Sequence, residues 1–269
     1  MANVVMDNRI IEAKAKELLM TALDTKTLMT IDDNLTKAEG EVVQVNTYAY
    51  DGEAEILAEG QGNTIIGEVT YVPKEYRVQC VQQMAKYLDE DINKDEKFYD
   101  VMVKGMVETM VNKLTSSFYN TIEDTSIFTY QMQAGTHISY DAVVDALASL
   151  NVEAEEGFVL VIPNSWKAYL RKDPDFKTCN VGEIIHSGQI GTVCGLPVVA
   201  TKMLDKDVVG DKAKAYVMSK EAVTLFVKKA MEAEQDRDAN KRENAMWLRE
   251  YYICALTDAT KAVRIVEGA

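Results

Sequence analysis

Small apolar and polar side chains alternate through VQVNTYAY (43–50), and this alternation predicts a β-strand. Asp51-Gly52 and the GQGN at 60–63 are turn signals, after which TIIGEVTYV (64–72) resumes the strand pattern. We therefore predict a long β-hairpin over residues 38–74. A two-stranded ribbon is marginal alone in water, so we expect it to pack against its own body or a neighbouring subunit.

A helical period governs residues 94–120, and we predict one long helix packed lengthwise on a sheet. Asn93 followed by Glu96 predicts its N-terminal cap. The apolar face is expected to contain Val103, Met106, Val107, Met110, Val111, Leu114 and Phe118. Residues 7–30 have a weaker helical pattern and predict an N-terminal arm, which we expect to be ordered only when something binds it.

From residue 139 onward, short helices and strands alternate. The segment 139–150 predicts a helix whose inner side contains Tyr140, Val143, Val144, Leu147 and Leu150. Strands are expected at 157–163, 195–201 and 214–220, with a short helix after the first of them. Residues 222–269 are predicted to be mostly β, with a charged connection at 232–244 and with Glu250 interrupting an apolar strand face. The fold class is therefore α+β.

The chain has 29 Lys and Arg against 43 Asp and Glu, which gives a net charge of −14. This balance argues against a non-specific polyanion binder, because neutralising phosphates needs a local excess of Lys and Arg. No apolar run approaches the roughly 18 residues that a membrane span requires. We therefore expect no membrane partner.

The sequence contains no recognisable catalytic or metal-binding motif. His137 and His186 lack metal-ligand spacing, and the four cysteines form no CxxC pair. The glycines at 182–195 fit no phosphate-binding loop, and no nucleophile elbow occurs. We predict no catalytic residue, no cofactor site and no metal site, which argues against an enzyme.

The order of these segments resembles the tailed-phage major capsid proteins of the HK97-like fold, over nearly the whole chain. SYDAVVDALASLNVEAEEGFVLVIPNSWKAYLRKDPDFK (139–177) is similar to the family's axial (A) domain, and SGQIGTVCGLPVVATKML (187–204) is similar to its G-x-I-x-x-x-x-G-x-P-V-V stretch. KAYVMSKEAVTLFVKK (214–229) and LREYYICALTDATKAVRIV (248–266) resemble the return into the peripheral (P) domain.

The resemblance implies a division of the chain. Residues 1–37 would form the N-arm and 38–74 the extended hairpin called the E-loop. The P domain would contain 75–138 and 222–269, with 94–120 as its spine helix, and the A domain would contain 139–221.

The resemblance also implies a function. The chain would self-assemble, as hexamers and pentamers, into the icosahedral head of a tailed bacteriophage and enclose its double-stranded DNA, with only weak, non-specific contact to that DNA and no catalysis. It would reside in the virion capsid after assembly in the bacterial host cytoplasm. A portal and decoration proteins would be further partners. Only about forty residues precede the hairpin, so a separate scaffolding protein is implied, or none is needed. No Lys lies between Lys37 and Lys74, and this argues against cross-linking through an E-loop lysine.

An acidic hairpin of this kind would act as a strap between subunits. The candidate assembly residues are Glu39, Glu41, Tyr48, Tyr50, Asp51, Glu53, Glu55 and Glu59. The candidate basic contacts on a neighbour are Lys167, Arg171, Lys172, Lys228 and Lys229. An encapsulin-type nanocompartment shell shares this fold and size, and a tail or adaptor protein would instead form rings or tubes. A soluble α+β enzyme is the alternative from a different class.

Overall fold

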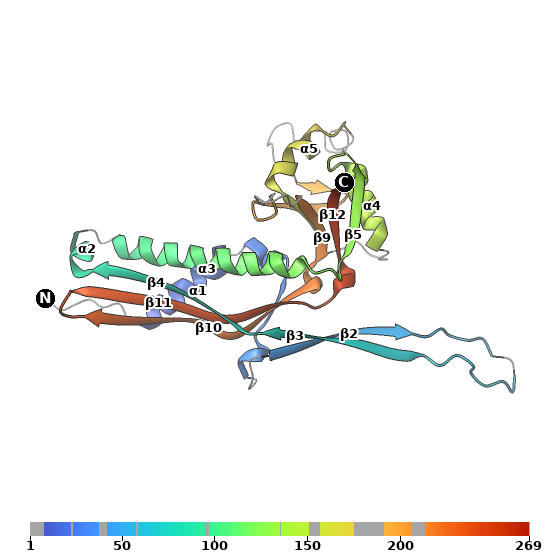
Figure 1. Ribbon diagram of the computed structural model, residues 1–269, viewed down its shortest axis with the longest axis horizontal. Coiled ribbons are helices and arrows are strands. Elements are labelled where there is room, and N and C mark those ends of the chain that lie inside the picture. Colours follow the sequence, from blue (N-terminus) through green and yellow to red (C-terminus); the bar gives the residue numbers. More distant parts are fainter. Residues whose placement is uncertain are drawn as a thin grey trace.

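The computed structural model describes residues 8–22, 24–37, 42–57, 59–94, 97–134, 136–150, 157–174, 191–205 and 213–268. Figure 1 shows three parts: a long helix on an elongated sheet, a second sheet of shorter strands with its own helices, and a hairpin that projects away from both. Helices and sheets are mixed rather than alternating regularly, which confirms the α+β prediction. None of the described helices is long and apolar enough to cross a membrane.

The elongated sheet has four strands in the order β1-β10-β11-β4. Their bounds are β1 Thr30–Asp32, β10 Val223–Asp238, β11 Glu243–Leu256 and β4 Gln79–Leu88. β1 runs parallel to β10, and the other two pairings are antiparallel. Two helices pack against this sheet and contact each other, α1 (Asn8–Ala22) and α3 (Phe98–Ile122).

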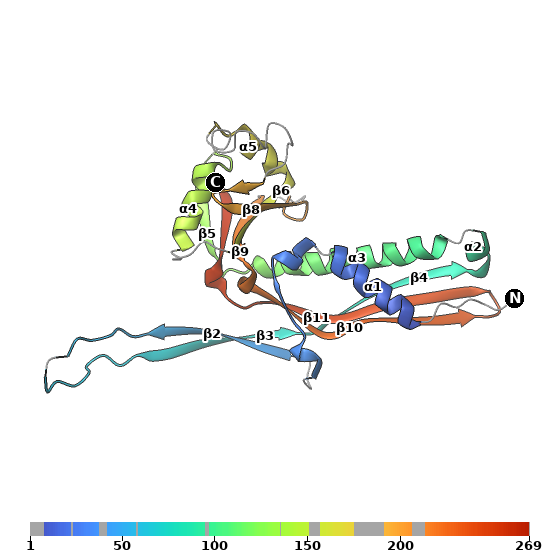
Figure 2. The same ribbon diagram turned by 180° about the vertical axis from the view of Figure 1, so that it is seen from behind.

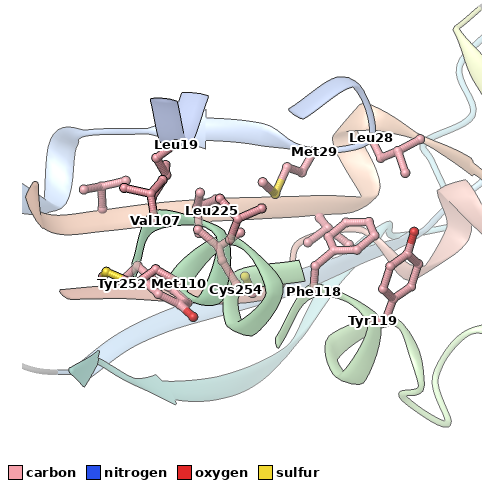
Figure 3. Packing of buried hydrophobic residues seen from close by; sticks show 14 of the residues in the cluster. Leu19, Leu28, Met29, Val107, Met110, Phe118, Tyr119, Leu225, Tyr252 and Cys254 are labelled. Atoms are coloured by element: carbon pink, nitrogen blue, oxygen red, sulfur yellow. The ribbon is translucent and has the colours of Figure 1, made fainter. Parts of the chain in front are cut away.

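The predicted spine helix is α3, and its predicted apolar face is buried in full. Met110 and Phe118 of this face lie against Leu225 and Cys254 of the sheet in one core cluster (Figure 3). The predicted start of the helix is wrong. A separate short helix, α2 (Asp89–Lys94), contains Asn93, and α3 begins at Phe98 without a side-chain cap.

The N-terminal arm is docked within this chain, contrary to the expectation that it needs a partner to be ordered. Ile11, Ala15 and Leu19 of α1 are buried in the same core cluster as α3. This spacing of four residues places all three side chains on one side of the helix. The Glu12 carboxylate also accepts a hydrogen bond from the backbone N–H of Ala233 on β10, 3.1 Å away.

The charged segment 232–244 is not a connection but the far end of the β10–β11 hairpin. The two strands stay paired from Glu232 opposite Arg249 to Asp238 opposite Glu243. Ion pairs tie the same end of the sheet together: Arg237 with Asp89 at 2.7 Å, Lys86 with Glu243 at 2.6 Å, and Arg249 with Glu234. Charges of both signs along two paired strands form cross-strand pairs, and this offsets their low strand propensity.

The second sheet has six strands in the order β5-β12-β9-β6-β8-β7. Their bounds are β5 Phe128–Ala134, β12 Ala262–Gly268, β9 Lys214–Ser219, β6 Phe158–Pro163, β8 Leu196–Thr201 and β7 Thr192–Val193. The short helix α5 (Lys167–Lys172) follows β6 as predicted. Brief 3₁₀ turns occur at Asp24–Thr27, Asn34–Lys37, Asn164–Trp166, Lys220–Ala222 and Ala259–Lys261.

The helix predicted at 139–150 is α4 (Tyr140–Leu150), with a different inner face from the one expected. Val143 and Leu147 are buried as predicted, whereas Val144 is 41% exposed. The two alanines, Ala142 and Ala146, complete the inner side instead. Because alanine side chains are small, they let α4 approach the sheet closely. A prediction that considers only large apolar residues does not identify these alanines as buried.

Two strands of the second sheet come from segments assigned above to the P domain. β5 lies before residue 138 and β12 after residue 222, yet β12 pairs with β9 on one side and β5 on the other. The boundaries placed at 138 and 222 therefore cut through a continuous hydrogen-bonded sheet.

Candidate assembly surface

The predicted hairpin consists of β2 (Val42–Asp51) and β3 (Glu68–Arg77), paired antiparallel from Val42 opposite Arg77 to Asp51 opposite Glu68. Figure 1 and Figure 2 show it extending from the end of the elongated sheet, with its tip far from the rest of the chain. β-Branched and tyrosine side chains favour this extended backbone. The hairpin is thus an arm of the subunit that is exposed along most of its length.

Large apolar side chains gather on one face of the hairpin, which we call the tyrosine face: Tyr48, Tyr50, Val69 and Tyr71. Tyr48 lies opposite Tyr71 with ring centroids 6.3 Å apart, and Tyr50 lies opposite Val69. Tyr48 is 65% exposed and Tyr50 is 71% exposed. Large contiguous apolar patches on a protein surface often mark interaction sites.

The tip, residues 52–67, is held by one carboxylate. Glu55 accepts hydrogen bonds from the Thr64 N–H at 2.8 Å and from the Thr64 hydroxyl at 2.6 Å. These hydrogen bonds lower the pKa of Glu55. These hydrogen bonds join the segment that follows β2 to the segment that precedes β3. Ile56, next to Glu55, and Ile66, two residues after Thr64, are almost fully exposed.

Two glycines at the start and end of the tip lie against Tyr50. A Cβ atom on Gly52 would lie 2.6 Å from the Tyr50 hydroxyl and 2.8 Å from the Gly67 Cα. A Cβ on Gly67 would meet the same tyrosine ring even more closely. The side chain of Tyr50 therefore folds over the point where the two strands end, and the absence of a Cβ at both positions makes room for it.

The base of the hairpin is fixed to the elongated sheet. Val45 is buried against Ile253 and Ala255 of β11 in a small apolar cluster. Tyr76 on β3 accepts a hydrogen bond from the Leu256 N–H at 3.2 Å and donates one to the Leu256 carbonyl at 3.5 Å. These contacts set the direction in which the hairpin leaves the sheet.

An ion pair adds a second attachment of the base. Lys74 on β3 pairs with Asp124, which follows α3 and also accepts hydrogen bonds from the Ser126 N–H and hydroxyl. Partial burial alone would raise the pKa of Asp124, but the hydrogen bonds and charge of Lys74 and the bonds from Ser126 outweigh it and lower that pKa to about 2. Asp124 is thus ionised at any pH near neutrality and keeps the hairpin attached to the end of the spine helix.

The structure places six of the eight predicted assembly residues on the hairpin. Asp51, Glu53 and Glu59 are exposed on the hairpin and Glu55 is half-buried at the tip, whereas Glu39 and Glu41 lie outside the described residues. The basic candidates lie in two other places. Lys167, Arg171 and Lys172 belong to α5, while Lys228 and Lys229 belong to β10.

Four hydrophobic residues of this surface were missed from the sequence: Ile56, Ile66, Val69 and Tyr71. The alternation in 69–72 contained the signal for two of them, because Val69 and Tyr71 share a face with the tyrosines that were selected. The candidate residues were predicted mainly from the acidic side chains of the hairpin, so its exposed apolar residues were not included.

Elsewhere in the described part of the chain, the metal-ligating side chain types do not cluster and Cys254 is buried. No group of three His, Cys, Asp or Glu side chains there is placed to hold a metal ion. Burial, with a smaller contribution from the charge of Glu250, raises the pKa of the Cys254 thiol to about 12, so this sulfur is a neutral core side chain. The hairpin carries most of the exposed large hydrophobic side chains of the described residues.

A comparison with family models found no match. The "Major capsid protein" of Staphylococcus phage phiMR11 is 24% identical over 279 residues, which covers 97% of this chain and 95% of that protein. Among solved structures, "Capsid of native GTA particle computed with C5 symmetry" superposes with a TM-score of 0.73 and 11% identity, covering 92% of this chain and 90% of that chain.

Two further structures agree in fold. A chain from Mycobacterium phage Che8 gives a TM-score of 0.63 at 16% identity and covers 86% of this chain and 89% of its own. "Crystal structure of virus-like particle from Pyrococcus furiosus" gives 0.65 at 12% identity and covers 97% of this chain and 100% of its own. Because coverage is nearly complete in both directions, the likeness concerns the whole arrangement of spine helix, two sheets and projecting hairpin.

Proposed function

We propose that this chain, which has the HK97-like fold of phage capsids, is a major capsid protein that assembles into the head of a tailed bacteriophage. The observation that carries the proposal is the match to a phage major capsid protein along 97% of the chain. The geometry supports it, because the most distinctive surface is a long ribbon exposing tyrosine and isoleucine side chains that a lone subunit leaves in water.

The hairpin supplies the strap of this assembly, and its partner is a second copy of the chain. The tyrosine face, Ile56 and Ile66 would lose contact with water on a neighbour, while the acidic side chains around them would meet basic groups there. Aromatic residues are enriched in the buried centres of interfaces, and charged residues are depleted there and concentrated at the rim. Lys167, Arg171, Lys172, Lys228 and Lys229 remain the candidates for those basic groups.

The division of the chain follows from this assignment. The N-arm is 1–37, and its β1 joins the elongated sheet; the E-loop is 38–74, and α3 with β4, β10 and β11 forms the P domain. The A domain is centred on 139–221, and we add β5 and β12 to it because both strands pair within its sheet. The firmly attached base and exposed tip of the E-loop suit a strap that reaches a neighbour at a fixed angle.

Further partners are part of the same proposal. Hexamers and pentamers of the chain would close the shell, with a separate scaffolding protein, a portal and decoration proteins completing the head. The net charge of −14 supports weak and non-specific contact with packaged double-stranded DNA. The shell would be assembled in the host cytoplasm and persist as the virion capsid, without a catalytic step.

Sedimentation velocity of the purified chain, with nuclease treatment of the heaviest fraction, tests the function. The proposal predicts shell-sized particles or capsomers, and nuclease-protected double-stranded DNA in particles recovered from infected cells. Closed shells that contain an enzyme instead of DNA would identify a nanocompartment. A uniform small oligomer, even when the chain is produced together with the other head proteins, would contradict assembly altogether.

A further inference from the structure

Three basic side chains from three different strands converge on the short segment at the end of α3, residues 122–124. Arg264 belongs to β12, Lys214 to β9 and Lys74 to β3. Figure 1 shows this end of the helix between the second sheet and the hairpin, so the segment lies where the three parts of the subunit meet. The same segment leads into β5, the edge strand of the second sheet.

Arg264 holds the backbone of this segment. One of its terminal nitrogens donates hydrogen bonds to the Ile122 carbonyl at 3.0 Å and to the Asp124 carbonyl at 2.8 Å. The Ile122 carbonyl is among the last four of the helix, which have no partner inside it, and an arginine near a helix end can satisfy such groups. The guanidinium is itself held by Tyr216, which lies opposite Arg264 on β9, with its buried ring centroid 5.8 Å from the central guanidinium carbon.

The two carboxylates of the segment bind the other two basic side chains. Glu123 pairs with Lys214 at 3.0 Å, and Asp124 pairs with Lys74 of the hairpin. Arg264 binds the carbonyl of Asp124 while Lys74 binds the carboxylate of the same residue. The second sheet and the hairpin are therefore joined through one residue at the end of the spine helix.

Local hydrogen bonds do not replace this arrangement. The Ser126 N–H and hydroxyl bind the Asp124 carboxylate from two residues further along the chain, so they orient it only relative to its own loop. Lys74 comes from a distant part of the chain, and the carboxylate meets it only when the loop itself is in place. Arg264 supplies two hydrogen bonds from the second sheet to the backbone of this loop.

We propose that Arg264 is a positioning residue for the hairpin. By holding the two carbonyls, it keeps Asp124 where Lys74 pairs with it, so that the placement of the second sheet and the attachment of the hairpin depend on each other. The alternative is an arginine that only caps the helix, whose contribution to stability would be independent of Lys74. The proposal concerns contacts within one chain and does not rest on the proposed function.

A double-mutant cycle on the purified full-length chain distinguishes these cases. Lys74→Met removes the ammonium group, Arg264→Met removes the hydrogen-bond donors, and chemical denaturation gives the equilibrium constant for unfolding of each variant. Groups in one network are coupled, whereas the effects of independent sites on this constant multiply. Lys74→Met should raise the unfolding constant about fivefold in the unaltered chain but less than about twofold in Arg264→Met. Equal fold-changes in the two backgrounds would overturn the proposal.

Two further variants show whether the coupling runs through Asp124. Lys261→Met removes an ion pair with Glu221 that lies on the connections between the two sheets, and its fold-change should be the same with and without Arg264. In Asp124→Asn the backbone carbonyl remains but the carboxylate is lost, so the coupling between Lys74 and Arg264 should disappear. Coupling that persists in Asp124→Asn, or equal coupling of Lys261 to Arg264, would show general stabilisation and overturn the proposal.

If Arg264→Met does not fold, Arg264→Lys takes its place in the cycle. An ammonium group keeps the positive charge but lacks the planar guanidinium that lies over Tyr216, so it holds the two carbonyls less firmly. The fold-change caused by Lys74→Met should then be smaller than in the unaltered chain by at least about twofold. An undiminished fold-change would count against a positioning role.

Discussion

The Tyr76 hydroxyl both accepts the Leu256 N–H, at 3.2 Å, and donates to the Leu256 carbonyl, at 3.5 Å. One side chain at the base of the hairpin thereby satisfies both backbone groups of a residue 180 positions away at the end of β11. The projecting hairpin is thus attached to the end of the sheet by a specific contact, and its direction depends on that contact.

Tyr76→Phe should destabilise the subunit by about 1–2 kcal/mol, because the Leu256 N–H then lacks its acceptor in a partly buried place. Chemical denaturation of the purified chain measures this change. Tyr71→Phe is the matched control, since Tyr71 is exposed on the tyrosine face, and it should change the unfolding free energy by less than about 0.5 kcal/mol. Equal effects of the two variants would contradict the role given to Tyr76.

Asp124 predicts an acid-sensitive attachment of the hairpin. Its folded-state pKa of about 2 lies below the ordinary value of 3.8. The stabilisation is therefore present above about pH 4 and is lost as the pH falls toward 2. Lys74 is 42% exposed and its charge is screened by solvent, so we expect Asp124→Asn to cost only about 1–2 kcal/mol at pH 7.

Denaturation at several pH values tests this prediction. The difference between Asp124→Asn and the unaltered chain should shrink as the pH falls from about 4 toward 2. Asp100→Asn removes the exposed ion pair with Lys14 and serves as the control, with an expected change below about 0.5 kcal/mol. A difference for Asp124→Asn that is constant from pH 7 to pH 2 would be inconsistent with this account.

Phe118 tests the packing of the spine helix. Its side chain is fully buried among α3 and sheet residues, so Phe118→Ala should cost about 3–5 kcal/mol through lost burial and the cavity that remains. Val101→Ala removes an exposed apolar side chain from the same helix and should cost less than about 0.5 kcal/mol. Thermal or urea denaturation distinguishes the two, and a small cost for Phe118→Ala would mean that α3 is loosely packed.

The tip of the hairpin should matter for assembly and not for folding. Replacing Ile56 and Ile66 by serine removes apolar area that is already exposed in the subunit, so the unfolding free energy should change by less than about 0.5 kcal/mol. Shell yield, measured by light scattering, should fall. Asn63→Ser changes a polar exposed residue of the same tip and should leave the yield unaltered. An unaffected yield in the isoleucine variant would exclude the tip from the contact.

The sequence predicted the parts of the fold that repeat a pattern over many residues. The stripe from Val103 to Phe118 identified α3, and the alternation from Val43 to Tyr50 identified the hairpin. Glu250 was predicted to interrupt an apolar strand face, but the local pattern could not show that the neighbouring Tyr252 of this face packs against α3. Local periodicity reports which face is buried but not what covers it.

Other features depended on contacts between distant segments. β4 was not predicted, because QCVQQMAKYL places Gln83 and Ala85 on its inward face and lacks an apolar alternation. The charged stretch 232–244 forms strands only because each strand has the other as a partner. Docking of α1 relies on Ala15, whose small side chain contributes little to an apolar stripe. The pairing of β5 with β12 joins segments more than a hundred residues apart.

Negative-stain electron microscopy of the chain and of a shortened hairpin tests the central claim most directly. Residues 52–67 are replaced by an Asn-Gly turn, which closes the hairpin because Asp51 and Glu68 already lie opposite each other. We expect closed shells or capsomers from the unaltered chain, and folded single subunits with an unchanged circular dichroism spectrum from the shortened one. Normal closed shells formed by the shortened chain would contradict the strap.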